Sequence, residues 1–298
     1  MCPSVKQLAE LGAELVREAL GEAALSCRTL SVAQDGQVVF EYVSAIAPTV
    51  IGKYIPHGDL GQTYARLRQL ANLTGTFLAV PRPIACDVSR RFLLTTKLEG
   101  KSCHRLDLRG ELNLERGGAA DALRRIGTAL AELHHACLDW GDVKSGTDHL
   151  RELVRPDPMS LAEAFPHYAE RIASTLLEFH IRSQEWAQVP PVPLHRDFHL
   201  RQLFDDGSRI GVVDWELAAE GDPAFDVAYF TAYLRTHYPK AEAEAGVEYF
   251  LSGYEPSNDL RARLPLYERF NYLRRACRRF RLRDDQWLES LADMIARL

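Results

Sequence analysis

The pattern of hydrophobic residues changes near Gly100, and this change constrains the fold more than any other feature of the sequence. Residues 1–99 contain short runs rich in Val, Ile, Thr, Phe and Tyr, which favour strands. Residues 100–298 instead carry apolar residues at spacings of three and four, which favour helices. We therefore expect an α+β fold with two lobes, a small strand-rich N-terminal lobe over 1–99 and a larger, mostly helical C-terminal lobe over 100–298.

Several short strands and one internal helix are expected in the N-terminal lobe. Residues 24–54 predict two or three antiparallel strands, with a turn at 34–37 that contains Asp35-Gly36. Residues 60–73 favour a helix, because their leucines and tyrosine recur at helical spacing. Residues 91–98 predict a further strand that ends before Glu99-Gly100.

Helices dominate the expected C-terminal lobe. Apolar stripes predict helices near 123–137 and 168–179. Residues 203–215 predict a short hairpin, since two apolar arms flank a turn made of Asp, Asp, Gly and Ser. The pair Asp222-Pro223 is typical of a helix start, and that helix is expected to reach about residue 234. Residues 261–298 are expected to be helical and are rich in arginine.

Composition and charge argue against several classes of protein. Hydrophobic residues make up 46% of the 298 residues and the net charge is −5, which is ordinary for a globular protein and unlike one that coats nucleic acid. No apolar run approaches the ~20 residues of a membrane span. Residues 1–20 predict a charged amphipathic helix and not a signal peptide. No two of the six cysteines lie within four residues of each other, so we expect reduced thiols in a cytoplasmic protein.

Three features of the sequence fit the chemistry of phosphoryl transfer. The run His195-Arg196-Asp197 is followed, five residues after the aspartate, by Gln202. Asp214 directly follows the apolar residues 210–213, and Lys53 follows an apolar pair in the N-terminal lobe. Phosphoryl transfer needs a metal ion, a lysine on the phosphates, and a carboxylate that orients the attacking hydroxyl and accepts its proton. Carboxylate and amide oxygens are hard ligands that suit magnesium.

These residues resemble the motifs of the aminoglycoside phosphotransferase family, whose fold is protein-kinase-like. The family's catalytic stretch His-x-Asp-x-x-x-x-Asn corresponds to residues 195–202. Its metal strand, Ile-Asp-Trp/Phe-Glu/Asp, corresponds to residues 213–216, and its Gly-Asp-Pro-x-x-Asp-x-Ala stretch to residues 221–228. The resemblance is specific over residues 195–228, and the rest of the chain fits by the order of its elements.

The resemblance implies a small-molecule kinase that moves the γ-phosphate of ATP or GTP to a hydroxyl of a metabolite or aminoglycoside-like acceptor. It implies Asp197 as the catalytic base and Lys53 as the lysine that binds the phosphates. It implies Mg²⁺ as the metal ion, with Gln202 and Asp214 as its ligands. It further implies that Asp226 braces the catalytic loop. The adenine is expected near the segment between the lobes that contains Thr96 and Leu98.

The sequence departs from the family pattern at three places. Gln202 stands where the family usually has asparagine, and its extra methylene can shift the metal geometry. No glycine-rich loop is visible, since Gly36 stands alone between the first two strands. No acidic residue lies between Asp59 and Asp87, so the helix glutamate that usually pairs with the lysine is missing. Asp59, a different residue, or nothing at all then holds Lys53.

Two alternative functions stay open at this point. These departures suit a catalytically weak or inactive pseudokinase, which binds nucleotide and has a regulatory role. A metal hydrolase that uses His195, Asp197 and His199 is the other alternative, but no further ligands with transition-metal spacing accompany them. His195 is more typical of a structural residue that binds its own loop.

The C-terminal arginines have two interpretations. Their helix carries an apolar stripe, so they can form a solvated face on a packed helix. Alternatively, some of them line the acceptor pocket, or bind a phosphate-bearing substrate or RNA. A basic wall suits an anionic or neutral acceptor better than a polycationic aminoglycoside. The residues concerned are Arg269, Arg274, Arg275, Arg278, Arg279, Arg281 and Arg283.

Overall fold

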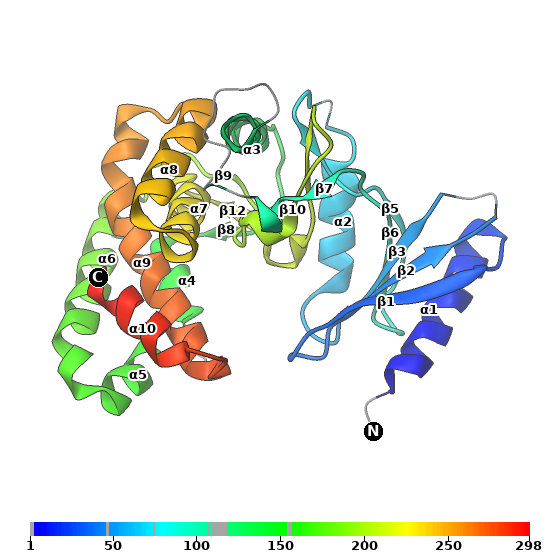
Figure 1. Cartoon of the computed structure of the whole chain (residues 1–298), viewed down its shortest axis with the longest axis horizontal. Helices are drawn as coiled ribbons and strands as arrows, with labels where there is room; N and C mark the ends of the chain where they lie inside the picture. Colours follow the sequence, from blue (N-terminus) through cyan, green and yellow to red (C-terminus); the bar gives the residue numbers. More distant parts are fainter. Residues whose placement is uncertain (1–2, 46–47, 74, 107, 109–117, 154–156) are drawn as a thin grey trace. The chain divides into compact units, whose positions relative to one another are not determined.

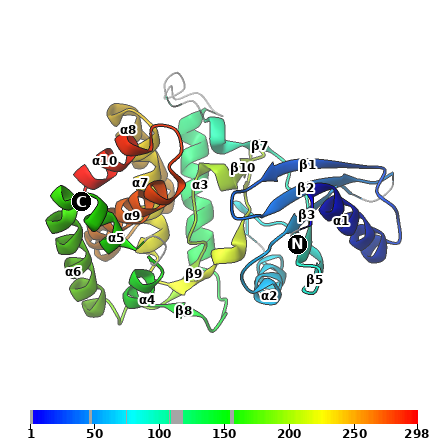
Figure 2. The same cartoon turned by 90° about the horizontal axis from the view of Figure 1, so that it is seen from below.

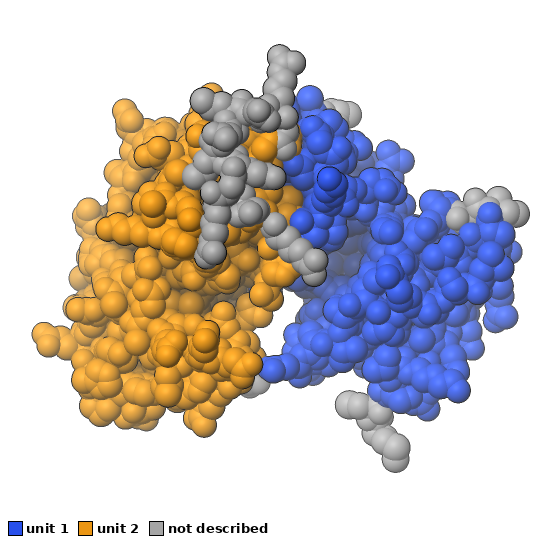
Figure 3. Space-filling view, viewed as in Figure 1, with its two compact units in different colours: residues 1–102, 203–218 blue, residues 103–202, 219–298 orange. Residues whose placement is uncertain are grey.

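The computed structural model describes residues 3–45, 48–73, 75–106, 108, 118–153 and 157–298. The chain forms two compact units, shown in different colours in Figure 3. Unit 1 contains Met1–Ser102 and Leu203–Ala218, and unit 2 contains Cys103–Gln202 and Ala219–Leu298. This division differs from the expected boundary at 99–100, because the segment Leu203–Ala218 belongs with the N-terminal residues.

Unit 1 is built on a five-stranded sheet with the strand order β1-β2-β3-β6-β5, in which all neighbours are antiparallel (Figure 1). Residues 24–54 form three strands, which confirms that prediction. The fifth strand was not predicted, because it begins with a proline, and a proline is tolerated at the first position of an edge strand. The strands are β1 (Ser26–Val32), β2 (Val38–Val43), β3 (Val50–Tyr54), β5 (Pro83–Asp87) and β6 (Phe92–Thr96).

Helix α1 (Val5–Leu20) covers one face of this sheet and confirms the predicted N-terminal helix. Its buried residues pack against strand residues such as Phe40 and Phe92. Side chains alternate along a strand, and Gly52 lies opposite Phe40 in the register of β2 and β3. The neighbouring Lys53 therefore points to the other face of the sheet, away from α1.

A second, four-stranded sheet explains why the hairpin belongs to unit 1. Strand β11 (Ile210–Val212) pairs in parallel with β4 (Leu78–Ala79), and β10 (Leu203–Asp205) pairs with β7 (Lys101–Ser102). Strands β10 and β11 form the predicted hairpin. Backbone hydrogen bonds on both sides of the hairpin therefore join it to the N-terminal residues.

Unit 2 is mostly helical, as expected. Its small sheet has the order β8-β12-β9, formed by Val143–Lys144, Ala219–Gly221 and Val192–Leu194. Its helices are α3 (Ala119–His134), α4 (Gly146–Arg151), α5 (Pro158–Ala164), α6 (Ala169–Glu185), α7 (Ala224–His237), α8 (Lys240–Tyr254), α9 (Asn258–Leu282) and α10 (Trp287–Ala296).

Helix α7 is the central helix of unit 2. All its residues from Ala224 to Leu234 are buried, which is the pattern of a helix surrounded by other elements. It packs against α8 and α9, and α7 and α9 lie side by side in both views (Figures 1 and 2). At the start of this helix the Asp222 carboxylate accepts a hydrogen bond from the Ala224 backbone N–H at 2.9 Å.

The expected fold class is confirmed, because a strand-rich N-terminal part and a helical C-terminal part are both present. None of the helices within the described residues combines the length and the apolarity of a bilayer span.

Candidate active site

In unit 1, Lys53 lies between two carboxylates. Its Nζ forms an ion pair with Asp214, and a second one, at 2.7 Å, with Glu216. Asp59 instead caps helix α2 (Leu60–Leu70), where its side chain accepts a hydrogen bond from the Gln62 backbone at 2.9 Å. Of the three possibilities left by the sequence, a different residue holds Lys53. The missing helix glutamate is thus replaced by carboxylates that follow β11.

The segment after β11 is fixed by its own residues. Asp214 has φ 75° and ψ 58°, a left-handed conformation that aspartate tolerates better than most residues. The next residue, Trp215, is buried and donates its indole N–H to the carbonyl of Val212 at 2.9 Å. A short 3-10 helix, Trp215–Leu217, follows. This turn brings the carboxylates of Asp214 and Glu216 within ion-pair distance of the same side chain, Lys53.

Helix α2 reaches this segment through an arginine. Arg66, which is 4% exposed, donates from Nη1 to the carbonyl oxygen of Ala218, just past the 3-10 helix. In kinase-like folds the corresponding helix supplies a glutamate to the lysine. In this chain the helix contacts the backbone of the carboxylate-bearing segment instead.

Lys53 and Glu216 shift each other's pKa, and Asp214 acts on both. Burial alone would lower the pKa of Lys53, but the charges of Glu216 and Asp214 outweigh it and raise that pKa. Burial and the nearby charge of Asp214 raise the pKa of Glu216, although Lys53 opposes this rise. This raised pKa keeps Glu216 partly protonated near neutral pH, and a bound cation would favour the ionised form of both Asp214 and Glu216. Because their oxygens are hard ligands, this donor set fits Mg²⁺.

In unit 2, the loop that carries Asp197 is fixed by a buried aspartate. Asp226, which is fully buried on α7, accepts hydrogen bonds from the backbone N–H groups of His195 at 2.6 Å and Arg196 at 2.8 Å. Arg196 adopts a left-handed conformation with φ 67°, which is unfavourable for a long side chain unless its surroundings hold it. Its side chain pairs with Glu152. The predicted bracing role of Asp226 is confirmed.

The Asp197 carboxylate accepts several hydrogen bonds. The Tyr229 hydroxyl donates to Oδ1 at 2.6 Å, and the Gln202 amide nitrogen lies 3.4 Å from Oδ2. Burial would raise the pKa of Asp197. The hydrogen bond and charge of His199, the charge of Arg274 and the Tyr229 hydroxyl together hold that pKa well below its ordinary value. Asp197 is therefore ionised near neutral pH. It can orient and deprotonate a hydroxyl in concert with bond formation.

The histidines near Asp197 have supporting positions. The ring of His195 is fully buried and its Nδ1 accepts the backbone N–H of Asp197 at 3.2 Å, which confirms the structural interpretation. His199 Nε2 lies 3.5 Å from Asp197 Oδ2. Within the part of the chain that the structure describes, no three His, Cys, Asp or Glu side chains form a metal-binding group.

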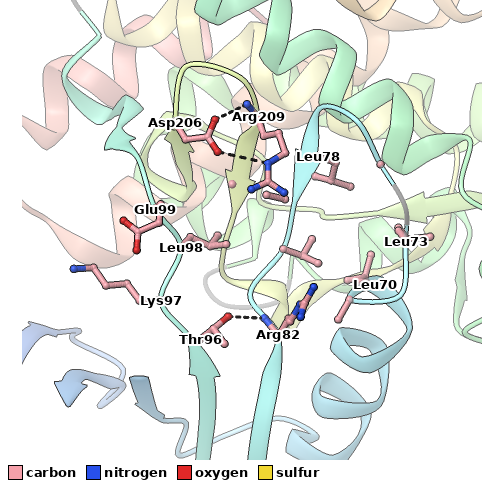
Figure 4. A pocket seen from close by; sticks show the side chains of 15 residues that line it. Leu70, Leu73, Leu78, Arg82, Thr96, Lys97, Leu98, Glu99, Asp206 and Arg209 are labelled. Carbon is pink, nitrogen blue, oxygen red and sulfur yellow. Dashed lines mark hydrogen bonds and ion pairs between the residues drawn. The ribbon is translucent and has the colours of Figure 1, made fainter. Parts of the chain in front are cut away.

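Thr96 and Leu98 line a cavity of about 270 Å³ in unit 1 (Figure 4). Leucines from α2 and β4 form part of its wall, and Thr96 Oγ1 accepts the Arg82 backbone N–H at 2.9 Å. Charged side chains also border it, including Lys97, Glu99, Asp206 and Arg209. This mixed wall is not the apolar slot that a purine base prefers, so the adenine position stays a prediction.

The structure brings the predicted residues together in two sets. Lys53 and Asp214 meet in unit 1, and Asp197 and Gln202 meet in unit 2. Sequence reasoning missed the roles of Glu216, Arg66 and Tyr229. Glu216 stands two residues after Asp214 in a quoted motif, so it had a visible signal. Tyr229 lies three residues after Asp226, a spacing that puts both on one face of a helix. No sequence motif indicated that Arg66 would contact the segment that follows β11.

The comparisons with known proteins agree with this geometry. The sequence model of the family described as "Phosphotransferase enzyme family" matches residues 30–267. A search of curated proteins found no match.

Among solved structures, a choline/ethanolamine kinase family protein from Mesorhizobium loti is similar, with a TM-score of 0.67 and 15% identity over 97% of this chain and 92% of the other. A spectinomycin phosphotransferase in complex with ADP and spectinomycin has a TM-score of 0.61 and 13% identity over 99% and 94%. The macrolide 2'-phosphotransferase of Brachybacterium faecium has a TM-score of 0.59 and 18% identity over 98% of both chains.

The structural likeness extends over nearly the whole chain and supports the predicted protein-kinase-like fold. Since the family model also covers most of the sequence, including all of residues 195–228, the chain belongs to the phosphotransferase enzyme family.

Proposed function

We propose that this protein is a small-molecule kinase that transfers the γ-phosphate of ATP or GTP to a hydroxyl of a small acceptor, with Mg²⁺. The proposal rests on two groups of residues, one in each unit. Asp197 is braced and ionised in unit 2, and Lys53 is bound by Asp214 and Glu216 in unit 1. A spectinomycin phosphotransferase with this fold was solved with ADP, which supports a nucleotide donor.

Each residue has a definite role in the proposed reaction. Lys53 binds the phosphate oxygens of the nucleotide, and its raised pKa keeps it charged. Asp214 and Gln202, joined by Glu216, would hold the metal ion, which supplies charge neutralisation on the phosphates. Asp197 orients the acceptor hydroxyl and accepts its proton. Thr96 and Leu98 are assigned to the segment that faces the nucleotide base.

The two units divide these roles. Unit 1 is assigned to nucleotide binding, and unit 2 to the base and the acceptor. The pseudokinase alternative loses one of its grounds, because Lys53 has carboxylate partners despite the absent helix glutamate. A cytoplasmic location, predicted from the charged N-terminal helix and the scattered cysteines, stays a prediction.

A radiolabel experiment tests the proposal. The protein is incubated with γ-labelled ATP or GTP, with and without Mg²⁺, and with a panel of hydroxylated metabolites. We expect slow metal-dependent hydrolysis without acceptor and faster transfer to one class of acceptor. Nucleotide binding by calorimetry without any turnover would favour the pseudokinase. Absence of both binding and turnover would overturn the proposed function.

A further inference from the structure

The arginines of helix α9 are of two kinds. Arg263, Arg269 and Arg279 each form an ion pair with a carboxylate. A second group, Arg274, Arg275 and Arg278, has no carboxylate at ion-pair distance among the residues that the structure describes. A partly buried guanidinium without a counter-ion is costly. Arg274 and Arg275 are partly buried, so another contact must stabilise them, whereas Arg278 is exposed to solvent.

Two of the unpaired arginines lie against aromatic rings of α7. The guanidinium carbon of Arg274 is 5.2 Å from the ring centroid of Tyr229, and that of Arg275 is 5.2 Å from the ring centroid of Tyr233. These distances are within the range of cation–π contacts. Tyr229 and Tyr233 are four residues apart and so share one helix face. The rings hold the guanidiniums in place without an ion pair, and the positive charge of Arg274 also acts on the Asp197 carboxylate.

This positive face continues to the catalytic aspartate. The same Tyr229 that contacts Arg274 donates its hydroxyl to Asp197. Arg274 Nη1 also donates to the backbone carbonyl of Arg196, next to Asp197, at 3.1 Å. Tyr233 stacks on His199 with ring centroids 5.1 Å apart. The arginines are therefore next to the residue that would face the acceptor, and all these groups belong to unit 2.

Arg275 has unused hydrogen-bond donors. Its Nε is buried and has no hydrogen-bond partner, and its Nη2 lies 3.2 Å from His237 Nδ1. Burial is the main cause that lowers the pKa of Arg275, and the like charges of Arg279 and Arg278 add to it. An anion placed here would satisfy these donors and offset the repulsion between the guanidiniums.

We propose that the acceptor is an anionic molecule, a hydroxylated compound whose carboxylate or phosphate group binds Arg274 and Arg275 while its hydroxyl lies at Asp197. This inference rests on the proposed phosphotransferase function and names its substrate class. It separates this chain from relatives that act on cationic drugs, because a polycation would be repelled by the same arginines.

The transfer step balances with the nucleotide as the only co-reactant. The acceptor oxygen forms a bond to the γ-phosphorus, and the bond between that phosphorus and the β–γ bridging oxygen breaks. The electron pair of the broken bond leaves with the nucleoside diphosphate. The hydroxyl proton passes to the Asp197 carboxylate and then to water.

An acceptor panel with matched charge tests the proposal. Glucose, gluconate, glucose 6-phosphate and hygromycin B are neutral, carboxylate-bearing, phosphate-bearing and cationic probes. Transfer is measured for the wild type, for Arg275→Gln, and for Arg269→Gln as a control on the same helix, since Arg269 pairs with the exposed Glu178. We expect the ratio of kcat/KM for anionic over neutral probes to fall at least ~10-fold in Arg275→Gln and to stay unchanged in Arg269→Gln.

Binding of inorganic phosphate provides a second measurement, which does not require turnover. Calorimetry at constant ionic strength should show phosphate binding to the wild type that is weakened at least ~10-fold in Arg275→Gln and retained in Arg269→Gln. Calorimetry with Mg²⁺ and ADP on the same proteins tests the proposed function separately.

Two results overturn the inference: a preference for neutral or cationic probes, or phosphate binding and probe ratios that Arg275→Gln leaves unchanged. Thermal midpoints check that each variant folds. If Arg275→Gln does not fold, Arg274→Gln replaces it in the phosphate-binding measurement, because Arg274 is the other arginine of the proposed anion site.

Discussion

At the scale of single residues, Asp197 is surrounded by groups that keep it charged. His199, Tyr229 and Arg274 all favour its ionised form. A carboxylate with such a low pKa is a weak base in the ground state. In the proposed reaction its contribution is therefore to hold the hydroxyl in line and to accept the proton late, as the oxygen–phosphorus bond forms.

The first prediction concerns the loss of this base. Asp197→Asn should lower turnover at least ~100-fold while binding of the nucleotide survives, because only the proton acceptor is removed. Since the pKa of Asp197 is held below its ordinary value, the wild-type rate should show no acid limb from this group between pH 5 and 8, and the loss should be equal across that range. Initial rates and calorimetry provide the check, with Asp285→Asn, at an exposed position, as the control. A variant that keeps its activity would contradict the assignment.

The second prediction separates charge from backbone conformation at Asp214. Asparagine tolerates the left-handed conformation of this residue, whereas alanine does not. Asp214→Asn should fold normally and yet lose Mg²⁺-dependent nucleotide binding, because one carboxylate ligand is gone. Asp214→Ala should lose the same binding and also about 1 kcal/mol of unfolding free energy. Calorimetry with and without Mg²⁺, together with urea unfolding, measures both effects. Unchanged metal-dependent binding in Asp214→Asn would place the metal site elsewhere.

The third prediction concerns Gln202, whose amide nitrogen lies 3.4 Å from Asp197 Oδ2. Gln202→Ala should raise the Mg²⁺ concentration needed for half-maximal rate, because the amide oxygen is lost. Gln202→Asn should lower that concentration if the loop accepts the shorter side chain, since one torsion less must be fixed. Initial rates at saturating nucleotide compare the three proteins. An alanine variant equal to the wild type at low Mg²⁺ would show that Gln202 does not touch the metal.

At the scale of elements, the sequence predicted what local patterns can encode. Helix α7 followed from Asp222-Pro223 and an apolar run, and the β10–β11 hairpin from its turn residues. The bracing by Asp226 followed only from the family resemblance. The partners of Lys53 could not be predicted, because Asp214 and Glu216 are more than 160 residues away along the chain and meet it only through the fold.

Arg66 provides the fourth prediction, which concerns how α2 is attached. Arg66→Met keeps most of the apolar length but leaves the carbonyl of Ala218 without its charged donor, so unfolding free energy should fall by about 1–3 kcal/mol. Because this carbonyl follows the segment that carries Asp214 and Glu216, affinity for the Mg²⁺–nucleotide complex should fall as well. Urea unfolding and calorimetry measure the two effects. Arg68→Met, at an exposed position of the same helix, is the control and should change neither. Equal behaviour of the two variants would show that the Arg66 contact has no positioning role.

At the scale of the whole molecule, the stability should depend on pH through a buried histidine that contacts Arg196, next to Asp197. His149 is 2% exposed and stacks on Phe225 with ring centroids 4.2 Å apart. Burial, then the charges of Arg196 and Arg274, lower its pKa well below the ordinary value. The ring is therefore neutral in the folded chain, whereas the unfolded chain can protonate it below pH ~6.5.

The fifth prediction follows from the sign of this difference. Between the ordinary histidine pKa and the lower folded value, the unfolded chain binds more protons, so acid favours unfolding. The contribution of His149 is fully present above pH ~6.5 and is lost as the pH falls toward the lower pKa of the folded state. His149→Phe keeps the stacking on Phe225 and cannot be protonated, so its unfolding free energy should fall less over the same interval. Urea unfolding at pH 5, 6, 7 and 8 compares the two proteins. Parallel pH curves would show that His149 does not couple protonation to folding. A smaller slope in the variant would identify the packing of α4 against α7 as an acid-sensitive contact of the fold.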